Sequence, residues 1–359
     1  MQYLNALNSI DGIGSRKLEM LVAHFSNAEK AWNANLQELI QSGIGEKLSE
    51  KFVEQRKNIN PDLEWKKLQD EEIFILSIND TRYPKLLREI HNPPYLIYAK
   101  GNLSLLNSTM IAVVGSRKFT EYGKRVAHAF GRDLAHAGIT IVSGLALGID
   151  AIAHESALEI KGKTIAVLGN GLDQKSIHPK TNLQLCQEII RNDGLIISEC
   201  PIGTPPTIGS FPARNRIMAG ISLGTIVIEA AIGSGTLITA NLALEFNREI
   251  FAVPGPIFYP QYEGNHKLIK TGAKIACAVS DILEEINFNS TSVKEEKVDY
   301  MPTSKEEEKI LHILNHEPSH IDTIRKMTKL ETSIIGSTLA ILEINGIVKN
   351  VGGQNYVRL

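Results

Sequence analysis

The chain has 359 residues, of which 43% are hydrophobic and 22% charged, an ordinary globular composition with enough material for two or three domains. Its formal net charge of −2 excludes a general field that attracts polyanions, so a nucleic-acid partner must be held by a local cationic patch. The lack of a long apolar run or a signal-peptide pattern, with three widely spaced cysteines, predicts a cytoplasmic protein that makes no membrane contact.

Residues 1–60 are expected to form a small helical domain of the SAM or helix–hairpin–helix type. Two similar glycine turns, GIGSRKLEML (12–21) and SGIGEKLSEKF (42–52), each precede apolar residues at helical spacing. In a helix–hairpin–helix module such a turn offers backbone N–H groups to phosphate. The same pattern fits a bundle whose glycines only permit tight turns. Phosphate binding and a scaffold role therefore both stay open for this segment.

A connector with one strand and the loop IHNPPYLIYAKG is expected at 61–106, and the sequence pattern changes after it. Short apolar runs follow, each suited to a strand buried on both faces, with segments of helical period between them. The runs are MIAVVGS (110–116), TIVSG (140–144), KTIAVLG (163–169), GLIISE (194–199), GTIVIEA (224–230) and REIFAVPG (248–255). This alternation predicts an α/β domain at 107–286, a Rossmann-like, doubly wound parallel sheet with helices on both faces.

A polar, aperiodic linker is expected at 287–304, before a winged-helix domain at 305–359. Three helices followed by a glycine-containing hairpin predict the winged helix. Its third helix, at 331–343, carries Glu331 and Glu343 but neither lysine nor arginine. A helix that reads a major groove normally brings cations. We therefore expect this domain to contact protein or to tune assembly, in contrast to the tail of a transcriptional regulator.

Glycine-rich loops follow four of the expected strands, at the edge where parallel sheets bind ligands. The loops contain GSR (115–117), SGLALGID (143–150), GNGLD (169–173) and GSGT (233–236). Glycine lets backbone approach an oxyanion, and hydroxyls and helix N–H groups donate to it. One such loop is explained by a tight turn alone, but four along one edge favour a phosphate-binding surface.

Two arginines lie in FPARNRIMAG, residues 211–220. Pro212 is expected to be the first residue of a helix, because its fixed φ and missing N–H cost least there. Arg214 and Arg216 then lie in the opening turns, where they oppose the positive end of the helix dipole. An anion must therefore compensate this pair.

Two kinds of anion are available to the pair. Glu199 and Glu229 end strands and can neutralise an arginine from inside the protein. A phosphate would approach from outside, where Arg117 after the first strand offers a further guanidinium suited to bidentate contacts. We expect one arginine of the pair to be held internally and the other to face the ligand.

Asp150 and His154 stand four residues apart on one expected helix face, a spacing that permits contact. An acid–base dyad is one interpretation, and a helix cap beside a structural histidine is the other, which we favour. Because no other His or carboxylate cluster has ligand spacing, we expect no metal. The dinucleotide fingerprint GxGxxG is missing after the first strand, and we expect no cofactor.

Several of these segments together closely resemble the DNA-processing protein A (DprA, or Smf) family. They are VVGSRKFTEYG, IVSGLALGIDAIAH, GKTIAVLGNGLD, FPARNRIMAG, EAAIGSGTLITA and FAVPG, with RYPKLLREIHNPPYLIYAKG upstream. The helical front and winged-helix tail are similar to the three-part version of the family. The resemblance implies a homodimer, joined through the Rossmann-like domain, without catalysis. It implies binding of single-stranded DNA, protection of incoming strands during natural transformation, and loading of the RecA recombinase.

The resemblance also implies a set of DNA contacts. They are Gly115, Ser116, Arg117, Ser143, Gly144, Lys163, Arg214, Asn215, Arg216, Ser234, Gly235 and Thr236. Phe211 and Phe119, beside the arginine motifs, either stack on bases or belong to the core. This chain has Ile177-His178-Pro179 where the family commonly has Tyr-Pro, so a contact made there by an aromatic ring is altered.

An enzyme is the main alternative function. Phosphoribohydrolases with related folds carry PGGxGTxxE, in which the glutamate serves the glycosidic bond. The comparable stretch here is IGSGTLIT (232–239), which has no acid after the Gly-Thr pair. We therefore expect a binding protein and no enzyme.

Overall fold

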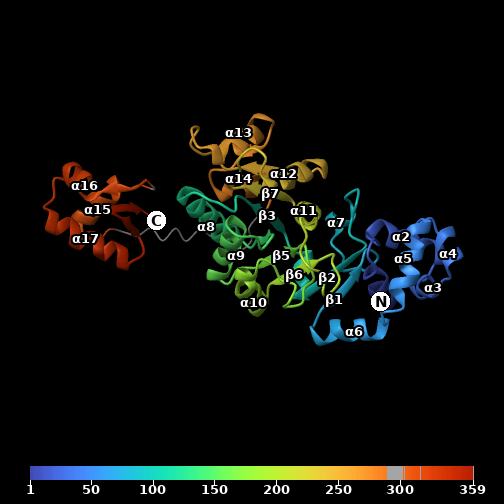
Figure 1. Cartoon of the computed structure of the whole chain (residues 1–359). Coiled ribbons are helices and arrows are strands. Elements are labelled where there is room, and N and C mark those ends of the chain that lie inside the picture. The colour runs from blue at the N-terminus through green and yellow to red at the C-terminus, as the bar shows by residue number, and fades with distance from the viewer. Residues whose placement is uncertain (289–301, 303, 316, 359) are drawn as a thin grey trace. The chain divides into compact units, whose positions relative to one another are not determined.

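The computed structural model describes residues 1–288, 302, 304–315 and 317–358 (Figure 1). The chain divides into two units, Met1–Ser292 and Val293–Leu359, which we describe one at a time. Most of the linker expected at 287–304 lies outside the described residues. Within the described part of the chain, no helix has both the length and the apolar composition needed to cross a bilayer.

The first unit begins with a bundle of short helices. They are α1 Gln2–Asn8, α2 Ser15–Phe25, α3 Ala28–Asn33, α4 Leu36–Gln41, α5 Glu46–Arg56 and α6 Pro61–Asp70. Gly12 and Gly45 have φ values of 97° and 95°, a region that favours glycine, and they form the turns before α2 and α5. The start of α2 faces the sheet, because the Tyr95 N–H donates to Ser15 Oγ at 3.0 Å. That contact favours the scaffold role for the first turn.

A nine-stranded sheet forms the centre of the first unit, in the order β1-β2-β6-β5-β4-β3-β7-β8-β9. The strands are β1 Phe74–Ser77, β2 Leu96–Gly101, β3 Met110–Val114, β4 Thr140–Ser143, β5 Thr164–Leu168, β6 Leu195–Ser198, β7 Gly224–Val227, β8 Glu249–Ala252 and β9 Lys274–Ile275. In this order, every pair of neighbouring strands from β6 through to β9 is parallel. The β1–β2 and β2–β6 pairs are antiparallel. The expected parallel sheet is confirmed.

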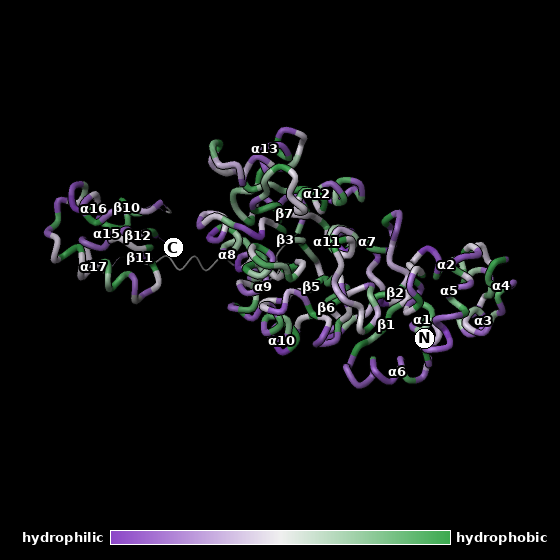
Figure 2. Tube along the Cα trace, viewed as in Figure 1, coloured by the Kyte–Doolittle hydropathy of each residue, from purple (hydrophilic) through white to green (hydrophobic). Residues whose placement is uncertain are grey.

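Helices cover both faces of the sheet. They are α7 Lys85–Arg88, α8 Glu121–His136, α9 Ile149–Glu159, α10 Leu183–Arg191, α11 Ser210–Ile221, α12 Gly235–Glu245, α13 Glu263–Lys270 and α14 Val279–Glu285, with 3-10 turns at Leu103–Asn107, Lys180–Asn182 and Pro260–Tyr262. Along β3, Ile111 and Val113 pack with residues of α8 and α9, and Ala112 and Val114 pack with residues of α11 and α12. The hydropathy along the chain agrees with this burial of the strands between helices. The strands β3 and β5 are hydrophobic, whereas helix α6 is largely hydrophilic (Figure 2).

Two local expectations about the first unit were wrong. Residues 96–101, expected in a loop, form β2, which pairs with β6 and is itself paired by β1. The turn around the Pro-Pro dipeptide ends at Tyr95, and the apolar residues after Tyr95 form a further strand of the sheet. Helix α11 begins at Ser210 and not at Pro212, which lies in its first turn. A proline there still removes no hydrogen bond, because the first N–H groups of a helix have no partner within it.

The second unit is the expected winged helix. Its elements are α15 Lys305–Ile313, β10 Ser319–His320, α16 Ile321–Thr328, α17 Thr332–Ile344, β11 Val348–Gly352 and β12 Asn355–Arg358, with the strands in the order β10-β12-β11. Buried apolar residues from all three helices, among them Ile310, Ile324 and Leu339, share one core. This unit therefore has a core of its own.

Candidate functional site

The carboxyl ends of the parallel strands lie along one edge of the sheet. From β3 the chain passes through β4 and β5 to β6 on one side, and β7 to β9 lie on the other. The point where the direction reverses is where open α/β sheets bind ligands. The Gly115–Arg117 loop follows β3 at that point, and the loops after β4, β5, β6 and β7 flank it.

A pocket of about 50 Å³ lies among these loops. Its lining residues are Arg117, Gly144, Ala146, Leu147, His178, Pro179, Phe211 and Arg214. A space of this size holds only a few water molecules, by the rule of about 10–15 Å³ for each. It therefore suits one small group of a ligand and not a whole nucleotide.

Phe211 forms an aromatic wall beside the pocket. The Arg117 guanidinium carbon lies 5.6 Å from the centroid of the Phe211 ring, a cation–π distance. The His178 ring lies 5.8 Å from the same centroid, centre to centre. Arg117 is exposed, and no carboxylate of the described residues lies within ion-pair distance of it. Its charge is thus available to a ligand that reaches the pocket.

Arg214 reaches the pocket from α11 and is only 5% exposed. One terminal nitrogen, Nη1, donates to the Val167 carbonyl at 2.6 Å, while the buried Nε has no hydrogen-bond partner among the residues that the structure describes. Burial lowers the pKa of Arg214, and the charge of nearby Asp150 opposes that change. A buried guanidinium with an unused donor is costly unless something else binds it. The same guanidinium group belongs to a residue that lines the pocket.

Gly144 makes room for that guanidinium. A Cβ atom at position 144 would overlap the Arg214 guanidinium group, so only glycine fits. The Gly144 N–H donates to Asp150 Oδ2 at 3.1 Å, which fixes the loop after β4. Burial raises the pKa of Asp150, and Arg214 opposes that rise. The loop, the carboxylate and the arginine therefore hold one another in place.

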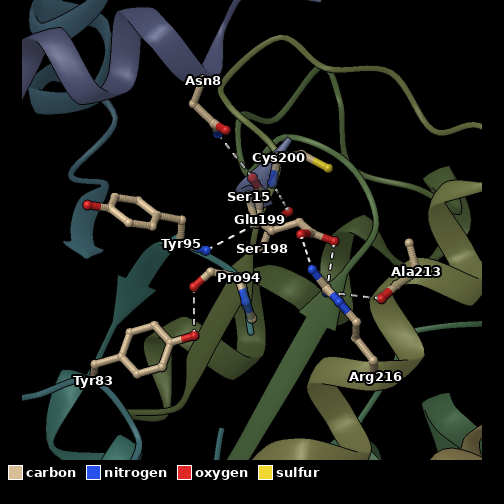
Figure 3. A network of polar contacts seen from close by, with 10 residues as sticks. All are labelled: Asn8, Ser15, Tyr83, Pro94, Tyr95, Ser198, Glu199, Cys200, Ala213 and Arg216. Carbon is tan, nitrogen blue, oxygen red and sulfur yellow. Dashed lines mark hydrogen bonds and ion pairs between the residues drawn. The ribbon is translucent and has the colours of Figure 1, made fainter. Parts of the chain in front are cut away.

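Arg216 points to the other side of α11 and is paired inside the protein. Its Nη1 and Nη2 donate to the two Glu199 carboxylate oxygens at 3.0 and 2.6 Å (Figure 3). The Asn8 side chain donates to the Glu199 carbonyl at 3.3 Å, which joins the helical bundle to the same residue. Arg216 is thus held by an internal carboxylate, and Arg214 lines the pocket. That Arg214 is the arginine that meets the ligand stays a prediction.

Glu229, the other candidate partner of an arginine, forms an ion pair with no arginine of the described residues. Its carboxylate accepts hydrogen bonds from the Thr120 N–H and hydroxyl and from the Tyr262 hydroxyl. Thr120 is the N-cap of α8, and Glu229 is fully buried. This carboxylate therefore fixes the start of α8 to the loop after β8.

Several of the predicted contact residues have internal partners. Ser143 Oγ donates to the Val113 carbonyl at 2.7 Å, and Ser116 Oγ donates to the Lys118 carbonyl at 2.7 Å. Asn215 Nδ2 donates to the Gly235 carbonyl at 3.5 Å, which joins α11 to the start of α12. Ser234 is the N-cap of α12 and accepts from the Thr236 N–H. These residues shape the loops on either side of the pocket.

Lys163 is not brought together with the others. It precedes β5, so it lies at the amino end of the strand, while the pocket lies at the carboxyl end. Its Nζ pairs with Asp193 Oδ2 at 2.7 Å. The pocket wall also includes Leu147, His178 and Pro179, which were not among the expected DNA contacts. The sequence had indicated their segments, the SGLALGID loop and the Ile177-His178-Pro179 stretch, but not that their side chains line one pocket.

His154 and Asp150 do not contact each other through a hydrogen bond. His154 Nδ1 lies 2.6 Å from Thr164 Oγ1, whose own proton goes to the Ile141 carbonyl, so the histidine is the donor. Burial lowers the pKa of His154 to about 3, and Arg214 adds to that effect. A neutral, buried histidine of this kind supports the structural interpretation of the pair.

Comparison with known proteins supplies the context of the site. Residues 74–287 match the family model for DNA recombination-mediator protein A, and residues 294–354 match the DprA winged helix domain. Protein Smf of Synechocystis sp. is 36% identical, over 99% of this chain and 98% of its own length.

Two solved structures are similar. DNA processing protein A of Streptococcus pneumoniae has a TM-score of 0.71 at 36% identity, covering 80% of this chain and 99% of that one. DNA processing protein A of Helicobacter pylori, described for its unique single-stranded DNA binding mode, has a TM-score of 0.54 at 32% identity. The match covers 60% of this chain and 96% of that one.

Proposed function

The chain belongs to the DNA recombination-mediator protein A family, and from that premise we propose that it binds single-stranded DNA at the Arg117–Arg214 pocket. In this proposal it protects incoming strands during natural transformation and loads the RecA recombinase onto them. One observation carries the proposal, namely that the exposed guanidinium of Arg117 and the buried guanidinium of Arg214 line one pocket. A backbone phosphate satisfies both.

A single strand fits the pocket better than a duplex. The pocket is small and is walled by the Phe211 ring, which suits one phosphate of a flexible strand. A duplex needs a longer cationic surface or a helix in its major groove. Helix α17 carries no lysine or arginine, which supports the proposal that the winged helix contacts protein.

Binding without catalysis is the activity that we propose. The two carboxylates that meet the arginine pair have internal roles, since Asp150 accepts backbone N–H groups and Glu199 pairs with Arg216. No acid follows the Gly235-Thr236 pair, where nucleotide-cleaving enzymes of related fold place one. The family model is described as a DNA recombination-mediator protein, which also favours a binding role.

We expect the protein to bind a labelled single-stranded oligonucleotide more tightly than the duplex of the same sequence. The logarithm of the affinity should fall linearly with the logarithm of salt concentration, because phosphate contacts release counterions. Fluorescence anisotropy across a salt series measures both. Equal affinity for the two forms, or no dependence on salt, would contradict the proposal.

A homodimer joined through the Rossmann-like domain is the partner arrangement that we propose. Ile275 on the edge strand β9 is 51% exposed, and Leu244 at the end of α12 is 65% exposed. Apolar side chains at an open sheet edge are suited to cover by a second chain. Two pockets in one dimer then multiply the contacts along a strand, which compensates for the small cationic patch of each subunit.

Replacing Ile275 with aspartate should convert the dimer to a monomer, because a carboxylate would be buried at the proposed interface without a partner. Sedimentation velocity at micromolar concentration measures the change. Leu63 on α6 is 59% exposed and far from β9 in the fold, so Leu63→Asp serves as the matched control. A dimer that survives Ile275→Asp, or is equally sensitive to Leu63→Asp, would place the interface elsewhere.

A further inference from the structure

Large apolar side chains are exposed along the pocket edge of the sheet, beyond the pocket itself. Phe119 after β3 is 38% exposed, and Ile232 after β7 is 55% exposed. The loop after β8 carries Ile257, Phe258 and Tyr259, which are 73%, 88% and 48% exposed. Most large apolar side chains of a folded domain are covered. A row of uncovered ones beside a proposed binding site therefore needs an explanation.

Internal contacts fix the loop after β8 to the loop that carries Arg117. The Tyr122 hydroxyl donates to the Pro254 carbonyl at 3.2 Å, and the Tyr122 and Tyr262 rings lie 5.7 Å apart, centre to centre. Glu229 bonds both to Thr120 and to Tyr262, as described above. The start of α8 thus holds the β8 loop beside the Arg117 loop. Both loops are therefore anchored at the start of α8.

The charge of this surface suits a polyanion. The segments GSRKFT, AIGSGT and VPGPIFYPQY contain Arg117 and Lys118 and no carboxylate. Acidic side chains appear only in the first helical turns that follow, as Glu121 of α8 and Glu263 of α13. Aromatic side chains next to unpaired cations are the combination with which proteins hold single strands, the rings stacking on bases and the cations meeting phosphates.

We propose that Phe119, Phe258 and Tyr259, here called the aromatic track, hold unstacked bases of the strand whose phosphate lies at Arg117. This inference rests on the proposed function and adds the path that the strand takes across the surface. The DNA runs from the pocket across the ends of β3 and β7 to the end of β8. The two steps from β3 to β8 measure about 10 Å at ~4.8 Å for each strand. Bases near the phosphate at Arg117 can therefore reach the track.

The test compares two lengths of oligothymidine. The shorter has about 2 nucleotides, which at ~3.4 Å for each nucleotide of one strand are too short to reach from the pocket to the track. The longer has about 16 nucleotides, the upper end of single-strand site sizes. Phe258→Ala should weaken binding of the long probe about tenfold, the effect of losing one stacked base, and leave the short probe unchanged. Phe258→Tyr should bind both probes as the wild type does. Phe74 on β1 is 50% exposed and lies away from this edge, so Phe74→Ala is the matched control.

Three outcomes separate this inference from the proposed function. A long probe bound equally well by wild type and Phe258→Ala, while Arg117→Ala weakens both probes, overturns the track and keeps the pocket. Arg117→Ala without effect on either probe overturns the proposed function itself. If Phe258→Ala changes the sedimentation coefficient of the DNA-free protein from dimer to monomer, a second copy of the chain covers this surface and the track is overturned.

Discussion

Arg117→Ala should weaken single-stranded DNA binding about 10- to 100-fold, the loss expected for a hydrogen bond to a charged group worth ~1.5–3 kcal/mol. The free energy of unfolding should change by less than about 0.5 kcal/mol, because the side chain is exposed and touches little beyond the Phe211 ring. Loss of one phosphate contact should also reduce the slope of log affinity against log salt by about 1. Fluorescence anisotropy and urea unfolding measure the three quantities.

Two further variants make the Arg117 experiment specific. Arg117→Lys keeps the charge but loses the planar fork, so its affinity should lie between those of the wild type and the alanine variant. Arg191 is exposed at the end of α10, the helix that leads to the amino end of β6, so Arg191→Ala is the control. Equal losses in Arg117→Ala and Arg191→Ala would mean that only net charge matters, which contradicts a defined site.

Gly144→Ala should lower both DNA affinity and stability. The added Cβ displaces the Arg214 guanidinium, which then loses its 2.6 Å bond to the Val167 carbonyl and its place in the pocket. Overpacking of a buried site costs roughly 1–3 kcal/mol of the free energy of unfolding. We expect single-strand affinity to fall at least about tenfold, the equivalent of ~1.4 kcal/mol. Urea unfolding and anisotropy measure the two effects.

A double-mutant cycle shows whether Gly144→Ala acts through Arg214. In an Arg214→Ala background the extra methyl group meets no guanidinium, so Gly144→Ala should produce no further loss of DNA binding. Gly336 on α17 has open space where an added Cβ would lie. Gly336→Ala therefore serves as the control for a Gly→Ala replacement that meets no neighbouring group. Additive losses in the double variant would show that Arg214 is not the residue through which position 144 acts.

Most of the sheet could be predicted from the sequence, because strands buried on both faces appear as short apolar runs. Strand β2 could not, since the proline pair before Leu96 indicates a turn and its pairing with β6 depends on a distant part of the chain. The start of α11 was misplaced for a related reason. Proline tolerates any position in the first turn, so its presence fixes the start of a helix only to within a turn.

The pocket was only partly predictable. Residues two apart on a helix point about 200° apart, so Arg214 and Arg216 had to face different surroundings. The sequence did not reveal which of them meets Glu199, because the rotation of α11 against the sheet depends on packing along its whole length. Lys163 was expected at the site by resemblance, although its position before a strand puts it at the opposite edge. His178 and Leu147 became visible as pocket residues only in three dimensions.

The pocket is assembled from segments far apart in the chain, with Arg117, Gly144 and Arg214 each following a different strand. No partial chain ending before α11 contains it, so a nascent polypeptide cannot hold DNA until the sheet has closed around β7. The same arrangement makes the strand a ligand of the native state alone. By mass action, DNA at 100 times its dissociation constant adds about 2.7 kcal/mol to the stability of the fold. Under the proposed function, the protein that holds a strand is therefore harder to unfold than the free protein.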